Sequence, residues 1–270
     1  MKLKLTALIL ILGGFSCILY IRSLSKINNS PDNNANIVSY YITDIDRDGK
    51  EELLVITASS SNADSANTVN SDRNSQEDKF NDDRTALINP EKHGDLLSIY
   101  SDFTLKNNKP YVQGEPVQTY ELWKLMPSKV QAGDVDGDGF EEITVCVYKT
   151  VKFDNKPDKR PFFYSTKSGA LAPFWLGSRL ARPFSEYTLY DLDQDGADEI
   201  VSIERLQDGS EIIVMYDWKG FGFEVNAMSE PLKAKASFAN NIHFKEENLK
   251  VKTGGAAFIL ELKDERIILN

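Results

Sequence analysis

The sequence predicts an all-β protein, a β-propeller-like array of about four four-stranded units preceded by one apolar N-terminal helix. Three observations predict it. One acidic spelling occurs three times, each copy runs directly into a short β-branched segment, and further strand-like segments follow each copy at similar distances. Because a single four-stranded sheet cannot bury its own faces, such units are expected to stack around an axis.

The repeated spelling is Asp-x-Asp-x-Asp-Gly-x-x-Glu, at residues 44–52, 134–142 and 191–199. Carboxylates at alternate positions of a tight loop can turn towards one centre, and glycine at the sixth position supplies the bend. Hard divalent cations take about six to eight oxygen ligands, so we predict up to three Ca²⁺ ions. The predicted ligands are the side chains of Asp44, Asp46, Asp48, Glu52, Asp134, Asp136, Asp138, Glu142, Asp191, Asp193, Asp195 and Glu199, and the backbone carbonyls of Lys50, Phe140 and Ala197.

The EF-hand is the rival interpretation, because its loop begins with the same spelling. An EF-hand loop closes with a glutamate at the twelfth position, where this chain has Val55, Val145 and Ser202. The segments that follow the loops are short and β-branched, which favours buried strands over helices. A strand-loop-strand cage that ends at the ninth position therefore fits better.

Each unit is predicted to have one strand before the acidic loop, one after it, a third that ends in tyrosine, and a fourth after a polar turn. The third strands are predicted at 96–100, 161–164 and 212–216. The first unit is longer between its loop and its tyrosine than the other two, and the surplus falls on a polar stretch. We interpret residues 59–94 as a disordered insertion.

A fourth, weaker unit is expected between residues 235 and 270, with strands near 237–239, 249–251, 257–262 and 266–269. At the place of its acidic loop stand Asn240, Asn241 and His243 instead of carboxylates. No metal is expected there. Residues 36–270 are thus predicted to form one domain.

The N-terminus carries a second signal, an apolar run from 5 to 21 that follows Lys2 and Lys4. Residues 1–26 are predicted to be a signal anchor or signal peptide, and residues 27–35 a polar linker. An uncleaved anchor, a lipoprotein on Cys17 and a secreted form cleaved near Ser25 remain open. Each alternative exports the C-terminal domain, so we expect a cell-membrane protein, single-pass or lipid-anchored, with that domain outside the cell, or a secreted form.

Composition adds little about partners. The formal net charge is −10, but fifteen of the 41 acidic residues lie in the three loops. Nucleic acid is not expected as a partner, because basic residues are few and the overall field is negative. Cys146 lies in a predicted core strand, where a buried thiol is the ordinary interpretation.

The three loops and the aromatic turn at residues 216–223 resemble the FG-GAP and VCBS repeats, calcium-bearing propeller repeats of integrin α-chain heads and many bacterial surface proteins. The resemblance covers most of residues 36–230. It implies a membrane-anchored bacterial surface protein. The Gly-Ala-Pro spelling of the integrin version is absent, and the chain has room for about four blades. We expect a closed four-bladed ring first, and an open stack completed by a partner second.

For function, we expect a calcium-stabilised binding or scaffold module whose ligand is a protein or a cell-envelope glycan. Arg160, Trp175, Arg179 and Arg182 concentrate basic and aromatic groups in the second unit and are the candidate ligand-binding residues. Packing between blades and charge balance at the loops are their alternative roles. No catalytic or cofactor-binding residue is predicted. The alternative function is an enzyme or enzyme subunit of the hydrolase-accessory type that acts with a partner.

Overall fold

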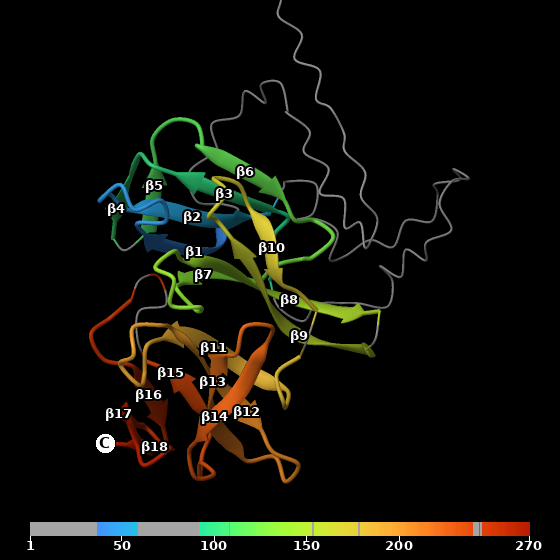
Figure 1. Ribbon diagram of the computed structural model, residues 1–270, viewed down its shortest axis with the longest axis vertical. Coiled ribbons are helices and arrows are strands. Elements are labelled where there is room, and N and C mark those ends of the chain that lie inside the picture. The colour runs from blue at the N-terminus through green and yellow to red at the C-terminus, as the bar shows by residue number, and fades with distance from the viewer. Residues whose placement is uncertain are drawn as a thin grey trace, which may run out of the picture.

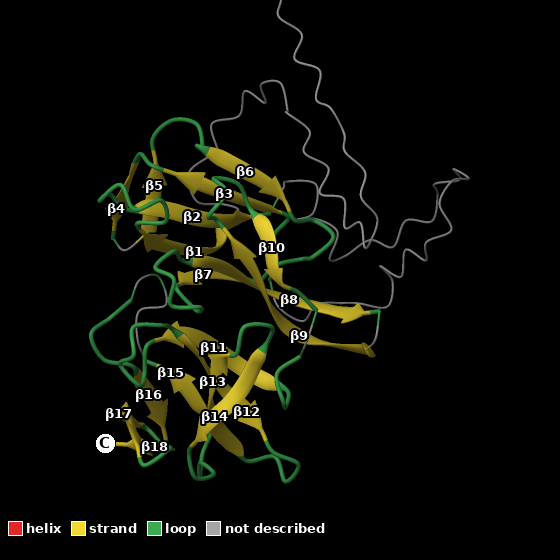
Figure 2. Ribbon diagram, viewed as in Figure 1, coloured by secondary structure: helices red, strands yellow, loops and turns green. Residues whose placement is uncertain are grey.

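A computed structural model describes residues 37–58, 92–107, 109–152, 154–177, 179–239, 243 and 245–270. In this part of the chain all regular elements are strands and none is a helix, which confirms the all-β prediction (Figure 2). Accordingly, no helix that could span a membrane occurs among these residues. The predicted N-terminal helix, the linker at 27–35 and residues 59–91 of the predicted insertion lie outside the described residues.

The first sheet has the strand order β1 (Ile37–Thr43), β2 (Glu52–Thr57), β3 (Leu96–Tyr100) and β6 (Gln118–Glu121) (Figure 1). Along the chain, a separate hairpin of β4 (Phe103–Lys106) and β5 (Lys109–Val112) separates β3 from β6. The sequence did not predict this hairpin. Gly94, at the end of the predicted insertion, packs against β2, since a Cβ there would lie 2.4 Å from the Ile56 side chain.

The second sheet pairs β7 (Lys129–Gly133), β8 (Glu142–Val151), β9 (Asp154–Ser165) and β10 (Ala172–Trp175) in sequence order. The third unit follows the same plan, with β11 (Phe184–Tyr190), β12 (Glu199–Arg205), β13 (Glu211–Trp218) and β14 (Phe223–Met228). The fourth unit consists of β15 (Ala236–Phe238), β16 (Lys250–Thr253), β17 (Ala256–Lys263) and β18 (Arg266–Leu269).

The third and fourth units join into one eight-stranded, nearly closed, barrel-like sheet. On one side a single parallel bridge between Met228 and Arg266 connects β14 to β18. On the other side β15 approaches β11, because the Phe238 amide donates a hydrogen bond to the Glu186 carboxylate over 3.0 Å.

Three apolar cores lie between successive units. Tyr41 and Leu54 of the first sheet meet Val145 and Phe162 of the second. A second core joins Phe163 of the second sheet to strands of the third unit. A third fills the interior of the eight-stranded sheet. The second sheet and the third unit therefore bury apolar side chains on both faces, which explains why their strands read as continuous apolar runs.

The two outer faces of the array differ from these interfaces. The outer face of the first sheet, with Tyr40 and Leu53, is covered partly by Phe103 and Val112 of the β4–β5 hairpin. In the fourth unit apolar and polar residues alternate, and Lys252, Glu261, Lys263 and Arg266 lie exposed on the side away from the third unit. Such alternation is typical of a sheet that faces water on one side.

His243 connects the two ends of the array. Its ring stacks on Tyr40 with the ring centroids 3.6 Å apart, and its Nδ1 atom lies 2.9 Å from the Tyr40 carbonyl oxygen. Its own carbonyl accepts a hydrogen bond of 2.8 Å from the Ile42 amide. The first and fourth units thus meet through backbone and ring contacts of His243, which lies between β15 and β16.

The His243 contact predicts a pH dependence. Burial lowers the pKa of His243 below its usual value, and the nearby Lys129 charge acts in the same direction. A histidine with a depressed pKa in the folded state contributes stability above its unfolded pKa near 6.5, and this contribution is lost as pH falls. We expect the contribution of His243 to the free energy of unfolding to fall between about pH 7.5 and about pH 5.5.

His243→Phe keeps an aromatic ring against Tyr40 and removes the titrating group. Urea denaturation of both proteins at the two pH values measures the effect. The variant should lose less stability than the wild type on acidification. Equal losses in the two proteins would contradict the assignment.

Candidate metal centres

Each acidic loop connects the first and second strands of its unit in one register. The residue before the loop pairs with the glutamate at the ninth position, as Thr43 with Glu52, Gly133 with Glu142 and Tyr190 with Glu199. The glutamate is therefore the first residue of the outgoing strand. Its side chain turns back to accept a hydrogen bond from the amide at the second position of the loop, over 3.1, 3.3 and 2.7 Å in the three loops.

The remaining loop hydrogen bonds also recur. The first aspartate accepts from the amide of the glycine, over 3.0, 2.6 and 3.2 Å in the three loops. The second aspartate accepts from the amide two residues later, and so does the third. These bonds hold one oxygen of each aspartate towards the loop backbone. All four acidic side chains are thus placed by contacts within nine residues of sequence.

The glycines at the sixth position behave as predicted. Gly49, Gly139 and Gly196 have φ values of +87°, +90° and +99°, in a region that side chains disfavour. The fourth position is also left-handed, at Arg47, Gly137 and Gln194, so each loop has two such bends. The two bends bring alternate side chains to one side.

The loops gather their carboxylates into three clusters whose ligand atoms lie within 4.8 Å of one another. The third loop brings together all four predicted acids, Asp191, Asp193, Asp195 and Glu199. The first loop brings together Asp44, Asp46 and Asp48 without Glu52, and the second Asp134, Asp136 and Glu142 without Asp138. These clusters could hold a metal ion. Coordination by the carbonyls of Lys50, Phe140 and Ala197 stays a prediction.

Several oxygens in the clusters are buried without a hydrogen-bond partner among the described residues. They are Asp44 Oδ1, Glu142 Oε1 and Asp191 Oδ1, one in each loop. Glu142 is fully buried. A buried carboxylate oxygen without a partner is costly, and a cation at the centre of the loop would satisfy it. The oxygen-only donor set fits a hard divalent cation.

The glutamates at the ninth position have strongly perturbed acidity. Burial raises the pKa of Glu52 to about 7, and the negative charge of Asp46 adds to this effect. Burial likewise raises the pKa of Glu142 and Glu199 to about 8, each with a nearby loop aspartate contributing. The folded loops thus oppose the accumulation of negative charge, which a bound cation would relieve.

Hydrogen bonds also link the acidic loops, with their flanking residues, between neighbouring units. Thr43 donates a hydrogen bond of 2.6 Å to the Glu141 carboxylate, and the Asp198 amide donates one of 2.6 Å to the Asp134 carbonyl. Lys245, from the segment before β16, forms an ion pair of 2.5 Å with Asp198. Sequence reasoning missed these contacts. The available signal was an acidic residue at the eighth position of every loop, where Glu141 and Asp198 stand.

Two further charged residues reach the loops from elsewhere in their units. Lys167, after β9, forms ion pairs with Asp136 and Asp138 of the second loop. Asp217, near the end of β13, acts electrostatically on Asp193 and Glu199 of the third loop. Neither residue was predicted, because neither belongs to the nine-residue spelling.

The four predicted ligand-binding residues all contact other residues of the protein. Arg160 is fully buried and donates to the carbonyls of Lys149, Lys156 and Gly177 and to Asp154. Trp175 packs edge-on against Phe163 and Phe223. Arg179 pairs with Asp154 and Asp158, and Arg182 with the buried Glu204. Arg160 and Arg179 thus both pair with Asp154, whereas Arg182 pairs with a different carboxylate, Glu204.

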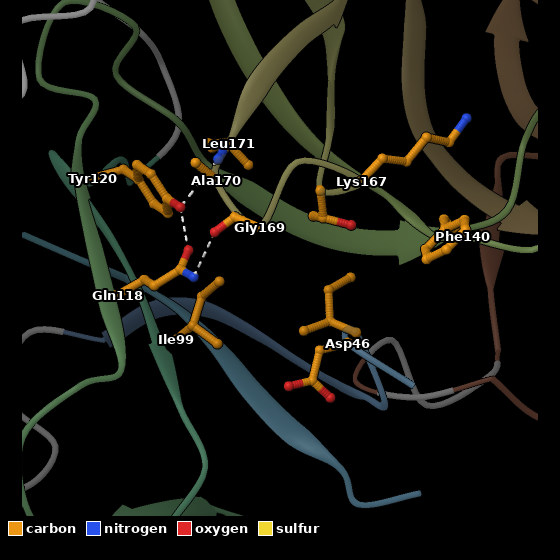
Figure 3. Close-up of a pocket in the computed structure, with 11 residues that line it drawn as sticks. Asp46, Ile99, Gln118, Tyr120, Phe140, Lys167, Gly169, Ala170 and Leu171 are labelled. Carbon is orange, nitrogen blue, oxygen red and sulfur yellow. Dashed lines mark hydrogen bonds between the residues drawn. The ribbon is translucent and has the colours of Figure 1, made fainter. Parts of the chain in front are cut away.

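A pocket of about 200 Å³ lies between the first and second sheets, beside the first two acidic loops (Figure 3). Phe140 and Lys167 lie at one end, and Gln118 and Tyr120 at the other. Gln118 donates a hydrogen bond of 3.0 Å to the Gly169 carbonyl, and the Tyr120 hydroxyl accepts one of 3.1 Å from the Leu171 amide. The pocket thus combines aromatic rings with ordered polar groups.

The contact between the second and third loops predicts that a side chain at Gly133 destabilises the protein. A Cβ at this position would lie 2.5 Å from Asp198 Oδ2 and 3.1 Å from Leu189 Cδ1. We expect Gly133→Ala to reduce the free energy of unfolding by roughly 1–3 kcal/mol, as overpacking usually does. Gly222→Ala is the control, because a Cβ there meets only Trp175 Nε1 at 3.6 Å. Chemical denaturation measures both, and equal stabilities of the two variants would contradict the prediction.

No protein-family model matches the chain, and no curated protein was found with a similar sequence. The resemblance to FG-GAP and VCBS repeats therefore depends on the acidic loops and the aromatic turn alone.

Proposed function

We propose that this chain is a calcium-stabilised binding or scaffold module that acts outside the cell and is held at the membrane by its N-terminal segment. One observation carries the proposal: three loops of one design each form a cluster of carboxylates. In each cluster one carboxylate oxygen is buried without a hydrogen-bond partner among the described residues. Folding these loops concentrates negative charge, and a divalent cation offsets that cost.

Calcium is the best candidate among the common metals. The clustered ligands are carboxylates only, which argues against zinc, whose sites usually include histidine or cysteine. Magnesium demands a near-octahedral site and keeps several waters, whereas calcium accepts flexible cages rich in carboxylates. Extracellular modules bind calcium with dissociation constants of roughly 10⁻⁴–10⁻³ M, which suits an exported domain.

We propose that the four units form a four-bladed propeller of the FG-GAP or VCBS type. The apolar cores between successive units support stacking of whole sheets, as blades stack in a propeller. The His243 contacts with Tyr40 and Ile42 support ring closure over an open stack. Because the outer face of the fourth unit is polar and exposed, closure depends on local contacts such as those of His243.

The ligand is proposed to be a protein or a cell-envelope glycan. The pocket of Figure 3 supports a glycan, because it offers the Tyr120 and Phe140 rings beside the Gln118 amide. Its volume of about 200 Å³ is below the roughly 300–1,000 Å³ of pockets for drug-sized molecules, so one ring of a larger polymer is the proposed occupant. The ion pairs of Arg179 and Arg182 make those side chains weaker candidates.

The metal part of the proposal predicts a large effect of chelation. Binding to the native state alone stabilises by about 2.7 kcal/mol per site at a free calcium concentration a hundred times the dissociation constant. We expect the thermal midpoint to fall by many degrees when calcium is replaced by excess chelator, and to recover when calcium is restored. Calorimetry measures the midpoint. A midpoint that does not change on chelation would overturn the structural role of calcium.

The ligand part predicts calcium-dependent binding to purified cell-envelope polysaccharide. Phe140→Ala should weaken this binding several-fold, because Phe140 is an exposed ring that lines the pocket. Phe221→Ala, in a turn of the third unit, removes an even more exposed ring and should have no effect. Sedimentation of the protein with the polymer measures binding. Equal binding by the two variants would exclude this pocket as the glycan site.

A further inference from the structure

The turn after the third strand brings a charged residue to the acidic loop in two of the units. In the second unit Ser165, Thr166 and Lys167 follow Tyr164, and in the third unit Asp217, Trp218 and Lys219 follow Tyr216. The two tyrosines pair with Ile143 and Ile200, each directly after the loop glutamate. The two segments are therefore equivalent in position, but the second unit places Lys167 against its loop, whereas in the third unit the lysine at that place, Lys219, pairs with Asp217.

In the second unit the turn presents a cation. Lys167 Nζ lies 3.1 Å from Asp136 Oδ2 and also forms an ion pair with Asp138. The turn is held in place because Thr166 donates a hydrogen bond of 3.1 Å to the Glu141 carbonyl. Lys167 thus uses two of the four predicted side-chain ligands, and Asp138 is the acid that does not join its cluster.

In the third unit the equivalent segment, at the end of β13, presents the Asp217 carboxylate, which is paired with Lys219. Asp217 Oδ2 accepts a hydrogen bond of 2.9 Å from Lys219, while its Oδ1 atom is buried without a hydrogen-bond partner among the described residues. The third loop is also the one in which all four acids cluster. The register of β12 and β13 places Asp217 beside Glu199, so a fifth carboxylate, itself paired with Lys219, stands next to this cluster.

The first unit has neither feature. Ser101 follows Tyr100, at the place of Ser165 and Asp217. Lys50 pairs with Asp48, but the two side chains are 79% and 45% exposed, so the pair is screened by water. The first loop thus serves as an internal reference for comparing the second and third loops.

We propose that these turn residues grade the calcium affinities of the loops. Asp217 strengthens the third site, which fills first, and Lys167 competes for the carboxylates of the second site, which fills last. The inference depends on the proposed calcium sites, and the fully buried Glu142 oxygen without a partner supports a cation at the second loop despite Lys167. Ligand charge tunes calcium affinity over several orders of magnitude in comparable loops.

The test is a calorimetric titration of the full chain with calcium, after removal of bound metal. Lys167→Met keeps the aliphatic stem and removes the charge, and it should tighten the weakest binding step about tenfold, equivalent to about 1.4 kcal/mol. Asp217→Ser introduces the residue type of the other two units, and it should weaken the tightest step about tenfold or more. Ser165→Asp transfers the carboxylate to the second unit and should tighten the weakest step.

Controls assign the steps and separate the possible failures. Asp191→Ala and Asp134→Ala disable the third and second loops and identify their steps. Lys252→Met makes the same charge change on the far face of the fourth unit and should leave every step unchanged. Circular dichroism in saturating calcium verifies that each variant is folded. If Asp217→Ser does not fold, Lys167→Met and Ser165→Asp still decide the question.

The outcomes are distinct. A wild-type chain that binds no calcium would overturn the proposed function itself. A wild-type chain that binds calcium, with Lys167→Met and Ser165→Asp unchanged from it, would overturn the graded affinities and leave the proposed function standing. Tightening by Lys167→Met but not by Lys252→Met would support the inference.

Discussion

Electrostatic repulsion within the acidic loops is the constraint on which the rest of the structure depends. Each loop must bring three or four carboxylates together to connect the first two strands of its unit. Backbone amides satisfy some of the oxygens, but burial holds the pKa of the glutamates well above its usual value. The local fold is therefore built around a concentration of charge that protein groups balance only in part.

The apolar cores explain why this arrangement can still fold as one array. Val145 and Phe163 lie on opposite faces of the second sheet and are both fully buried, in two different cores. Stacking of the sheets thus supplies the hydrophobic stabilisation. The loops fix the register of the hairpins that the first two strands of their units form. The fourth unit has a single apolar face and no acidic loop, so it ends the array.

The sequence predicted the features that depend on local chemistry. The acidic loops follow from nine residues, because glycine at the sixth position and alternate aspartates are sufficient to specify the bends. The β4–β5 hairpin was missed because Lys106, Asn107 and Lys109 give it a polar sequence with weak strand signals. Lys167 was missed because it pairs with an aspartate 31 residues away, a distance that only the pairing of β8 with β9 closes.

The arginine-rich segment shows the limit of reasoning from composition. Basic and aromatic residues together suggest a binding surface, yet Arg160 uses its guanidinium to fix the long β8–β9 hairpin and the chain near Gly177. Its burial follows from the carbonyls that surround it, which a sequence does not reveal. The same composition can thus serve internal cross-linking, and only the hydrogen-bond partners distinguish the two roles.

Contacts between the loops argue against treating the units as independent. Propeller blades are often regarded as quasi-independent units, and stacking through apolar cores alone would agree with this view. At the acidic end, however, Asp198 of the third loop donates its amide to the second loop, and Thr43 next to the first loop donates to Glu141 of the second. A cation that ordered one loop, as proposed, would therefore also order a donor or acceptor of its neighbour. Under that proposal, binding at successive loops would be coupled through the hydrogen bonds between them, and the array would gain rigidity as its loops filled.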